Sequence, residues 1–242
     1  MIYLDYAATA PLLPEVIKAM HEAEKHFFAN ASALHTPGHL AMNEIEQTRH
    51  LLAELINASP EEIIFTSGAS EANNTVIHTF EGHKIEASPL EHHSIIEATK
   101  LYQGNKNPKL YSCMLANNET GDILTLPDKE QGYLHSDLTQ ALGKLPLDVK
   151  ALNLDYATFS AHKIGGPIGV GALYVKNGSP FKPLIIGGNQ EGKRRGGTYN
   201  TVGIVGFGAA LAQMKKQKSW QLYDQKIRKL RDTLASPAIR IT

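Results

Sequence analysis

The chain has 242 residues, of which 42% are hydrophobic, so it can bury a sizeable core as one domain or as one domain with an appendage. Lysine and arginine number 24, the same as aspartate and glutamate, and this balance gives no basic field that would indicate nucleic acid or an anionic membrane as a partner. We find no membrane-span pattern, no signal-peptide pattern and a single cysteine, Cys113. We therefore expect a soluble, cytoplasmic protein without an internal disulfide framework.

Strand-like and helix-like segments alternate along most of the chain. Residues 37–58 predict an amphipathic helix, because Ala41, Ile45 and Leu52 fall on one face with charged residues opposite. The segments that follow are predicted in this order: strand 62–68, helix 69–80, strand 84–89, helix 93–103, then strands 109–116, 133–137, 154–160 and 169–176, and a helical tract over 200–236. This alternation is typical of an α/β fold with a mostly parallel central sheet flanked by helices, where ligands bind at the carboxyl ends of the strands.

Polar residues stand at the ends of these predicted strands. The Ser67–Glu71 turn leads into a helix, whose N-terminal N–H groups and dipole favour an anion such as a phosphate. Three later strand ends carry His92, Asp137 and Lys163, which would supply an aromatic ring, a carboxylate and an amine. Each feature alone is more often an ordinary turn or surface group. Together they fit pyridoxal phosphate (PLP), which needs a Schiff-base lysine, an acid at its ring nitrogen and a phosphate site.

Eight stretches, in order between residues 3 and 211, carry a specific family resemblance. They read YLDYAATAPLLPEV, NASALHTPGHLA, EIIFTSGASEANN, EHHSII, NNETG, HSDLTQALGKLPLDV, SAHKIGGPIGVGALYV and GGNQEGKRRGGTYNTVGIVGFGAAL. The chain resembles the cysteine desulfurases, within the class V group of fold-type-I PLP-dependent enzymes. The resemblance implies the large domain of that fold, and conversion of cysteine to alanine with sulfur transfer for iron–sulfur cluster assembly. It also implies L-cysteine or a similar amino acid as the substrate.

The matching motifs imply a role for each residue of the predicted site. Lys163 would form the Schiff base with PLP, and Asp137 would pair with the ring nitrogen and keep it protonated. His92 would stack on the ring and act in catalysis, while Gln140 would hydrogen-bond the ring oxygen. The phosphate would be held by side chains or backbone of four residues: Ala69, Ser70, Ser160 and His162.

Two further implied roles concern the substrate and a second subunit. Asn118 would approach the ring oxygen and the substrate carboxylate. Thr198 would reach the phosphate of a neighbouring subunit, which implies a homodimer. The loop before Thr198 departs from the family pattern at Asn189, Gly192 and Lys193, which leaves its geometry open.

The resemblance also divides the chain into parts. Residues 14–221 correspond to the PLP-binding large domain, and residues 1–13 and 222–242 to remnants of the small domain. The C-terminal part of that small domain, which carries the family's persulfide cysteine and substrate arginine, is absent from the sequence. Cys113 falls within the predicted strand 109–116, so we expect a small buried residue and not the sulfur acceptor. Full activity would then need a C-terminal half in cis, or in trans from a companion chain.

Other interpretations stay open at this point. The chain could be another class V lyase, such as a selenocysteine lyase, or an inactive module that keeps the fold and acts as a dimerising or partner-binding protein. The glycine-rich stretch 203–208 resembles a dinucleotide loop, but it lies inside a predicted helix. Pro37 and Gly38 separate His35 from His39 and break the helix that a shared metal face would need, so we predict no metal site.

Overall fold

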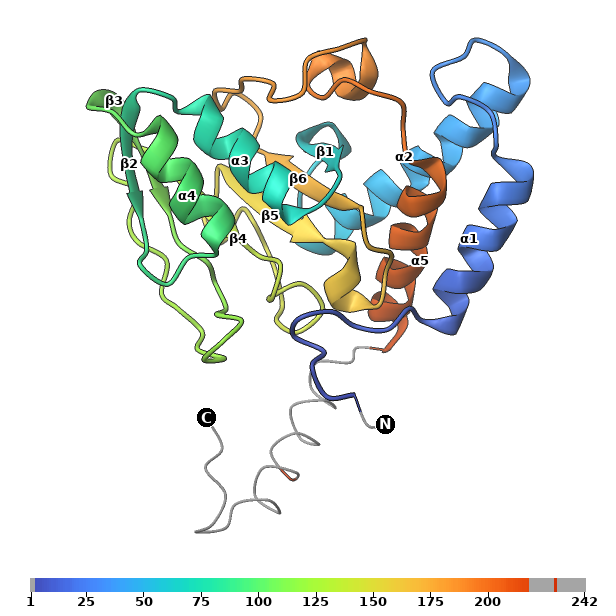
Figure 1. Ribbon diagram of the computed structural model, residues 1–242, viewed down its shortest axis with the longest axis horizontal. Helices are drawn as coiled ribbons and strands as arrows, with labels where there is room; N and C mark the ends of the chain where they lie inside the picture. Colours follow the sequence, from blue (N-terminus) through green and yellow to red (C-terminus); the bar gives the residue numbers. More distant parts are fainter. Residues whose placement is uncertain (1–2, 218–228, 230–242) are drawn as a thin grey trace.

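A single sheet forms the centre of the molecule in a computed structural model, which describes residues 3–217 and residue 229 (Figure 1). Its strand order is β1-β6-β5-β4-β3-β2. The strands are β1 (Ile63–Thr66), β2 (His83–Ala87), β3 (Lys106–Ser112), β4 (Tyr133–Asp137), β5 (Tyr156–Ser160) and β6 (Gly171–Val175). β2, β3, β4 and β5 pair in parallel, whereas β6 is antiparallel to both of its neighbours, β1 and β5. Every strand except β6 therefore runs in the same direction, which confirms the predicted mostly parallel sheet.

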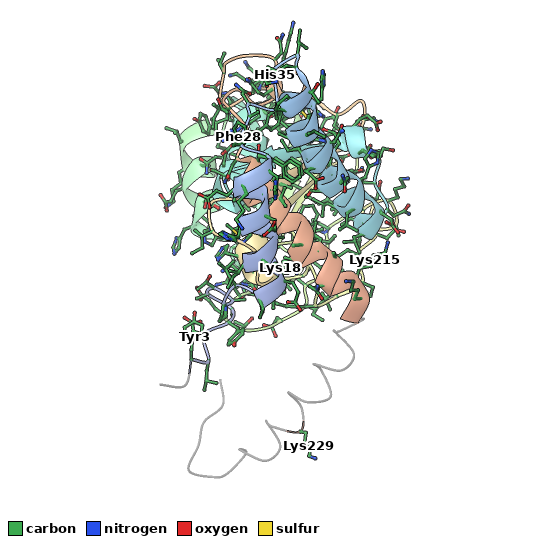
Figure 2. The ribbon with its side chains drawn as sticks, turned by 90° about the vertical axis from the view of Figure 1, so that its right-hand side faces the viewer. Tyr3, Lys18, Phe28, His35, Lys215 and Lys229 are labelled. Atoms are coloured by element: carbon green, nitrogen blue, oxygen red, sulfur yellow. The ribbon has the colours of Figure 1, made fainter. Side chains whose placement is uncertain are left out.

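Helices cover both faces of this sheet. They are α1 (Pro14–His26), α2 (Thr36–Ile56), α3 (Ala69–Thr79), α4 (His93–Tyr102) and α5 (Thr201–Gln217). α3 and α4 pack together on one face, and α2 packs with α5 on the other, with α1 outside against α5 (Figure 1). Lys215, labelled in Figure 2, lies near the end of α5. It forms a 2.5 Å ion pair with Glu54 of α2. The three layers confirm the predicted α/β class.

The core is divided between the two faces because successive strand residues point to opposite sides. In β1, Ile64 packs beneath α3 and α4, while Phe65 belongs to the core beneath α2 and α5. In β5, Tyr156 and Ala157 divide in the same way. All four are at most 4% exposed, and burying each of the larger side chains stabilises the fold by about 1.5–3 kcal/mol.

The helix α1 was missed by the sequence analysis, although Pro14 at its start, Glu15 in its first turn and Lys25 in its last turn are ordinary helix-end signals. His35 immediately precedes α2 and caps it, because its Nδ1 accepts the Gly38 N–H at 3.1 Å.

β3 is shifted relative to the predicted strand 109–116. It begins at Lys106, which pairs with His83 of β2, and the register then shifts so that Leu110 pairs with Ile85. Pro108 lies in this irregular stretch, before the pairing with β4 begins at Leu110, so it does not have to donate to either ladder. It ends at Ser112, and the chain then leaves the ladder to form an isolated bridge between Ala116 and Ile123. The placement of Cys113 inside this strand was therefore wrong by one residue.

Because β1, β3, β4 and β5 run in the same direction, their carboxyl ends lie at a single edge of the sheet. The predicted site residues lie at this edge. The proposed domain boundaries at residues 14 and 221 stay a prediction, and residues 222–242, apart from Lys229, lie outside the described residues. Within the part that the structure describes, no helix combines the length and apolar character needed to cross a bilayer.

Candidate active site

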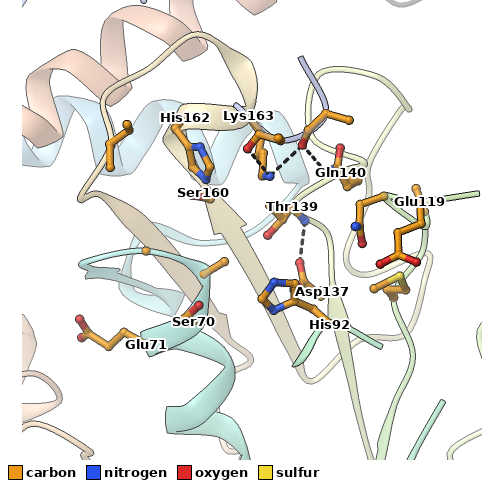
Figure 3. A pocket seen from close by; sticks show the side chains of 18 of the residues that line it. Ser70, Glu71, His92, Glu119, Asp137, Thr139, Gln140, Ser160, His162 and Lys163 are labelled. Atoms are coloured by element: carbon orange, nitrogen blue, oxygen red, sulfur yellow. Dashed lines mark hydrogen bonds between the residues drawn. The ribbon is translucent and has the colours of Figure 1, made fainter. Parts of the chain in front are cut away.

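A cavity of about 580 Å³ opens at the carboxyl edge of the sheet (Figure 3). Its size falls within the range typical of small-molecule sites. Nine of the ten residues predicted for the site line it: Ala69, Ser70, His92, Asn118, Asp137, Gln140, Ser160, His162 and Lys163. Thr198 lies instead in a neighbouring depression of about 170 Å³ that shares Ser67 and Gly169 with the cavity. The strand-end pattern thus brings together a phosphate-type turn, a ring, a carboxylate and an amine.

Asp137, the last residue of β4, is held rigidly at the base of this cavity. It is 6% exposed, and both carboxylate oxygens accept hydrogen bonds from the protein. Oδ1 accepts the Thr139 backbone N–H at 2.9 Å, and Oδ2 accepts Asn73 Nδ2–H at 2.8 Å (Figure 3). A buried carboxylate with these two donors keeps its orientation without substrate, as a partner for a ring nitrogen must.

Lys163 lies in the short turn Ala161–Ile164 that follows β5. Its Nζ donates to the carbonyls of Ala7 and Ala8, at 2.8 and 2.7 Å (Figure 3). Burial lowers the pKa of this amine, while the negative charges of Asp137 and Asp5 act in the opposite direction. A lysine with a lowered pKa at the end of a strand has the property that a nucleophilic amine requires.

The N-terminus of α3 forms another part of the cavity wall. Ala69 and Ser70 begin this helix of 11 residues, so their N–H groups point toward the end of the helix that attracts anions. Glu71 fixes the turn, because it accepts the Ser67 N–H at 2.8 Å and pairs with Arg195 through two bonds of 2.9 and 3.1 Å. Gly171 is required next to the turn, since a Cβ there would lie 2.7 Å from the backbone of Gly68.

Three further predicted residues complete the wall near Lys163. His162 Nδ1 lies 3.0 Å from Thr9 Oγ1, and burial, with the Lys163 charge, lowers the pKa of the imidazole. Ser160 is 3% exposed at the end of β5. Gln140 is half-buried, donates to Ala7 O at 2.9 Å and accepts from Lys144 Nζ at 2.5 Å.

Several residues of the site were missed by the sequence analysis. The N-terminal segment contributes Asp5, Ala7 and Ala8 to the cavity lining, and α3 contributes Asn73 behind Asp137. Thr139 also lines the cavity, and its Oγ1 is buried without a hydrogen-bond partner among the described residues. All of these residues stand within the quoted motifs, but only Thr139 is adjacent in sequence to a predicted site residue, Gln140, which is the one local signal that could have found it.

A polar layer lies beneath Asp137 on the α3–α4 face of the sheet. Ser112 Oγ donates to Glu91 Oε1 at 2.9 Å and lies 2.9 Å from His135 Nδ1, and His135 Nε2 lies 3.1 Å from Thr158 Oγ1. All four residues are at most 5% exposed. Burial, reinforced by the charge of Asp137, raises the pKa of Glu91 to about 8.

Cys113 is buried, as predicted, with 7% of its surface exposed. Burial, followed by the nearby Glu91, raises the pKa of its thiol, which makes the thiolate nucleophile less available. The thiol does not line the cavity. In the described part of the chain no three His, Cys, Asp or Glu side chains are grouped so as to hold a metal ion.

The loop that departs from the family pattern is anchored by a buried ion pair. Glu191 accepts two hydrogen bonds from Arg49, at 2.7 and 2.9 Å, and one from the Phe65 N–H at 3.2 Å. Glu191 and Gly192 both have positive φ, at 50° and 62°. The substituted Gly192 therefore suits a left-handed turn, and the loop, including Thr198, is folded onto β1.

The residues that line the cavity have the chemistry that PLP requires. The cavity combines a fixed carboxylate, an amine with a lowered pKa and a helix N-terminus, and it leaves the buried Thr139 hydroxyl without a partner. Together with a mostly parallel sheet between two helix layers, these features define a fold-type-I PLP-dependent protein.

Comparisons with known proteins agree with this class. The family model described as aminotransferase class-V matches residues 2–110 and 103–237. The cysteine desulfurase IscS of Dictyoglomus turgidum is 38% identical, with 87% of this chain and 63% of the relative covered. That of Methanosarcina thermophila is 33% identical over 99% of this chain and 68% of the relative. The solved NifS-like protein from Rickettsia africae has a TM-score of 0.89 at 32% identity, covering 100% of this chain and 77% of that one.

The chain belongs to the class V aminotransferase family and, within it, to the cysteine desulfurases. The family depends on PLP. The chain spans about 63–68% of the length of these two curated relatives. A further solved structure, described as SspA in complex with cysteine, has a TM-score of 0.84 at 32% identity, with 95% of this chain and 78% of that one covered.

Proposed function

We propose that the chain binds PLP through Lys163 and uses it to remove sulfur from cysteine. The observation that carries this proposal is the convergence of Lys163, Asp137 and the N-terminus of α3 on one cavity. PLP supplies, when bound, an electron sink for bonds at the substrate's α-carbon. The complex of cysteine with a protein of similar fold supports cysteine as the substrate.

The residues of the cavity have separable roles in this proposal. Asp137 holds a proton on the ring nitrogen, because its carboxylate is already fixed by two donors. Lys163 Nζ would hold PLP covalently, and its lowered pKa would also suit it to accept and return protons beside the substrate. His92 would lie against the ring, Ser70, Ser160, His162 and the Ala69 N–H would hold the phosphate, and Gln140 and Asn118 would contact the ring oxygen and the substrate, since all of them line the cavity.

The sulfur acceptor comes from elsewhere in this proposal. The attacking thiolate takes the cysteine sulfur as a persulfide, the electron pair of the broken Cβ–S bond stays with Cβ, and a proton added at Cβ completes the methyl group of alanine. Cys113, the single cysteine of the sequence, is 7% exposed and outside the cavity lining, so a thiol beyond these residues or on a companion chain takes the sulfur. We also propose a cytoplasmic homodimer in which Thr198, next to the cavity, contributes to the partner's phosphate site.

Uptake of PLP by the purified chain tests the proposal. We expect a visible absorption band in the wild type that is lost in Lys163→Ala and kept in Lys182→Ala, since Lys182 is an exposed lysine paired with Glu81. A colourless chain that takes up no added PLP would refute the cofactor assignment.

Sulfide release from cysteine then tests the activity. We expect little release from the chain alone and more after addition of a cysteine-bearing companion protein. A chain that binds PLP but gives no release under either condition would favour an inactive, partner-binding member of the family.

A further inference from the structure

A chain of hydrogen bonds joins two residues that line different parts of the cavity. Asn73, on α3, is fully buried, and its Nδ2 group donates both to Asp137 Oδ2 at 2.8 Å and to Ser94 Oγ at 2.9 Å. Ser94 Oγ lies 2.8 Å from Nδ1 of His92. Asp137 and His92 are therefore connected through Asn73 and Ser94, which come from the helices α3 and α4.

The direction of each bond follows from the chemistry of the groups. An ionised carboxylate can only accept, so the Asn73 amide must turn its nitrogen toward Asp137. The same nitrogen donates its second hydrogen to Ser94 Oγ. Asn73 Oδ1 has no partner among the described residues, which shows that the site uses this side chain for its N–H groups.

The bonds at His92 fix which ring nitrogen is left free. Nδ1 accepts the Ser94 backbone N–H at 3.1 Å, because His92 caps the N-terminus of α4. Ser94 Oγ already accepts from Asn73, so its own hydrogen is available for Nδ1. A nitrogen that accepts these bonds carries no hydrogen, and the ring proton of neutral His92 must lie on Nε2.

We propose that Asn73 and Ser94 are positioning residues that tie the orientation and tautomer of His92 to the Asp137 carboxylate. His92 then presents Nε2–H to a molecule in the cavity, and Asp137 keeps its fixed orientation through the same amide group. The benefit for PLP rests on the proposed function, because it assumes that His92 and Asp137 both contact the cofactor ring. The hydrogen-bond relay itself belongs to the protein without cofactor.

Nitrogen NMR of the histidine side chains in the cofactor-free chain tests the relay, at a pH where imidazole is neutral and with His92→Gln to assign the signals. We expect the His92 proton on Nε2 and a shifted Nδ1 signal in both Ser94→Ala and Asn73→Leu. In the Ser94→Ala background, Asn73→Leu should no longer move that signal, because the connecting hydroxyl is gone. Thr75→Val removes another buried α3 hydroxyl outside the relay and should leave His92 unchanged.

Two results would overturn the relay: a neutral His92 with its proton on Nδ1, or an Asn73→Leu effect that persists without the Ser94 hydroxyl. If Asn73→Leu does not fold, an Nδ1 signal that stays unshifted in Ser94→Ala would overturn the relay instead.

A PLP titration separates this inference from the proposed function. Ser94→Ala should weaken PLP binding about three- to ten-fold, as expected for loss of one hydrogen bond. A wild type that binds no PLP would end the proposed function and leave the NMR result standing. Unchanged PLP affinity in Ser94→Ala would refute the relay's contribution to the cofactor site.

Discussion

Asp137 and Lys163 lie in the same cavity but are supported in different ways. The inner wall, defined as Asp137 together with Asn73 and Glu91 behind it, is buried and bonded within the sheet and its covering helices. The outer wall, defined as Lys163 and Gln140, is more open and contacts the carbonyls of Ala7 and Ala8. The Asp137 carboxylate is therefore fixed by the sheet and its covering helices, whereas the Lys163 amine depends on a segment 156 residues away in the sequence.

The strongest test of the inner wall is the pH dependence of stability in Glu91→Gln. The pKa of Glu91 is raised to about 8, so between its ordinary value near 4.5 and 8 the folded chain binds more protons than the unfolded chain. Stability therefore falls as the pH rises through this window, and ionised Glu91 costs about 3 kcal/mol between pH 6 and pH 9. We expect Glu91→Gln to remove this part of the slope in urea unfolding.

Glu97→Gln is the matched control for Glu91→Gln. Glu97 is an exposed residue of α4 paired with Lys100, and that pairing lowers its pKa. It is ionised throughout pH 6–9 in both states, so its replacement should leave the slope unchanged. Equal slopes for the wild type and Glu91→Gln would contradict a buried, protonated Glu91.

Asp137→Asn tests how much the charge of the inner wall contributes to PLP binding. The substitution keeps an acceptor for the Thr139 N–H but removes the charge that faces the ring nitrogen. We expect PLP to bind about 10- to 100-fold more weakly, since hydrogen bonds to charged groups contribute about 1.5–3 kcal/mol. Spectrophotometric titration measures the change, and wild-type affinity in this variant would argue against Asp137 as the ring-nitrogen partner.

Gln140→Leu should have the smallest effect. Gln140 is half-buried, and its amide already bonds Ala7 O and Lys144, so little of its hydrogen-bonding capacity is left for a ligand. We expect less than about a five-fold loss of PLP affinity, from one neutral hydrogen bond. A loss as large as that of Asp137→Asn would mean that the outer wall is as firmly arranged as the inner one.

The sequence predicts which residues meet at the cavity better than it predicts the residues that hold them in place. Asp137, His92 and Lys163 could be predicted because the ends of parallel strands share one edge of a sheet. Asn73 could not, because it is one more polar residue in a helix and lies 64 residues from the carboxylate it binds. The contact of Lys163 with Ala7 and Ala8 also arises only from tertiary packing.

Most helices and strands could also be predicted from the sequence, but not all of them. Strand β4 was predicted with its observed bounds, and most other elements within a few residues. β3 begins earlier than predicted because Lys106 pairs with His83 of β2 ahead of a register shift that contains Pro108, a pairing that the sequence pattern does not reveal. The helix α1 was missed although its terminal residues carried helix signals.

The proposal that PLP attaches to Lys163 can be tested directly by identifying the amine that binds it. Lys144 is the competing candidate, because loss of hydration and the charge of Lys163 lower its pKa as well, although the residue as a whole is exposed. Borohydride reduction of the PLP-loaded chain, followed by peptide mass spectrometry, locates the attachment. We expect the modification on Lys163, unchanged in Lys144→Met and absent in Lys163→Ala. Attachment to Lys144, or equal labelling of both lysines, would contradict the account.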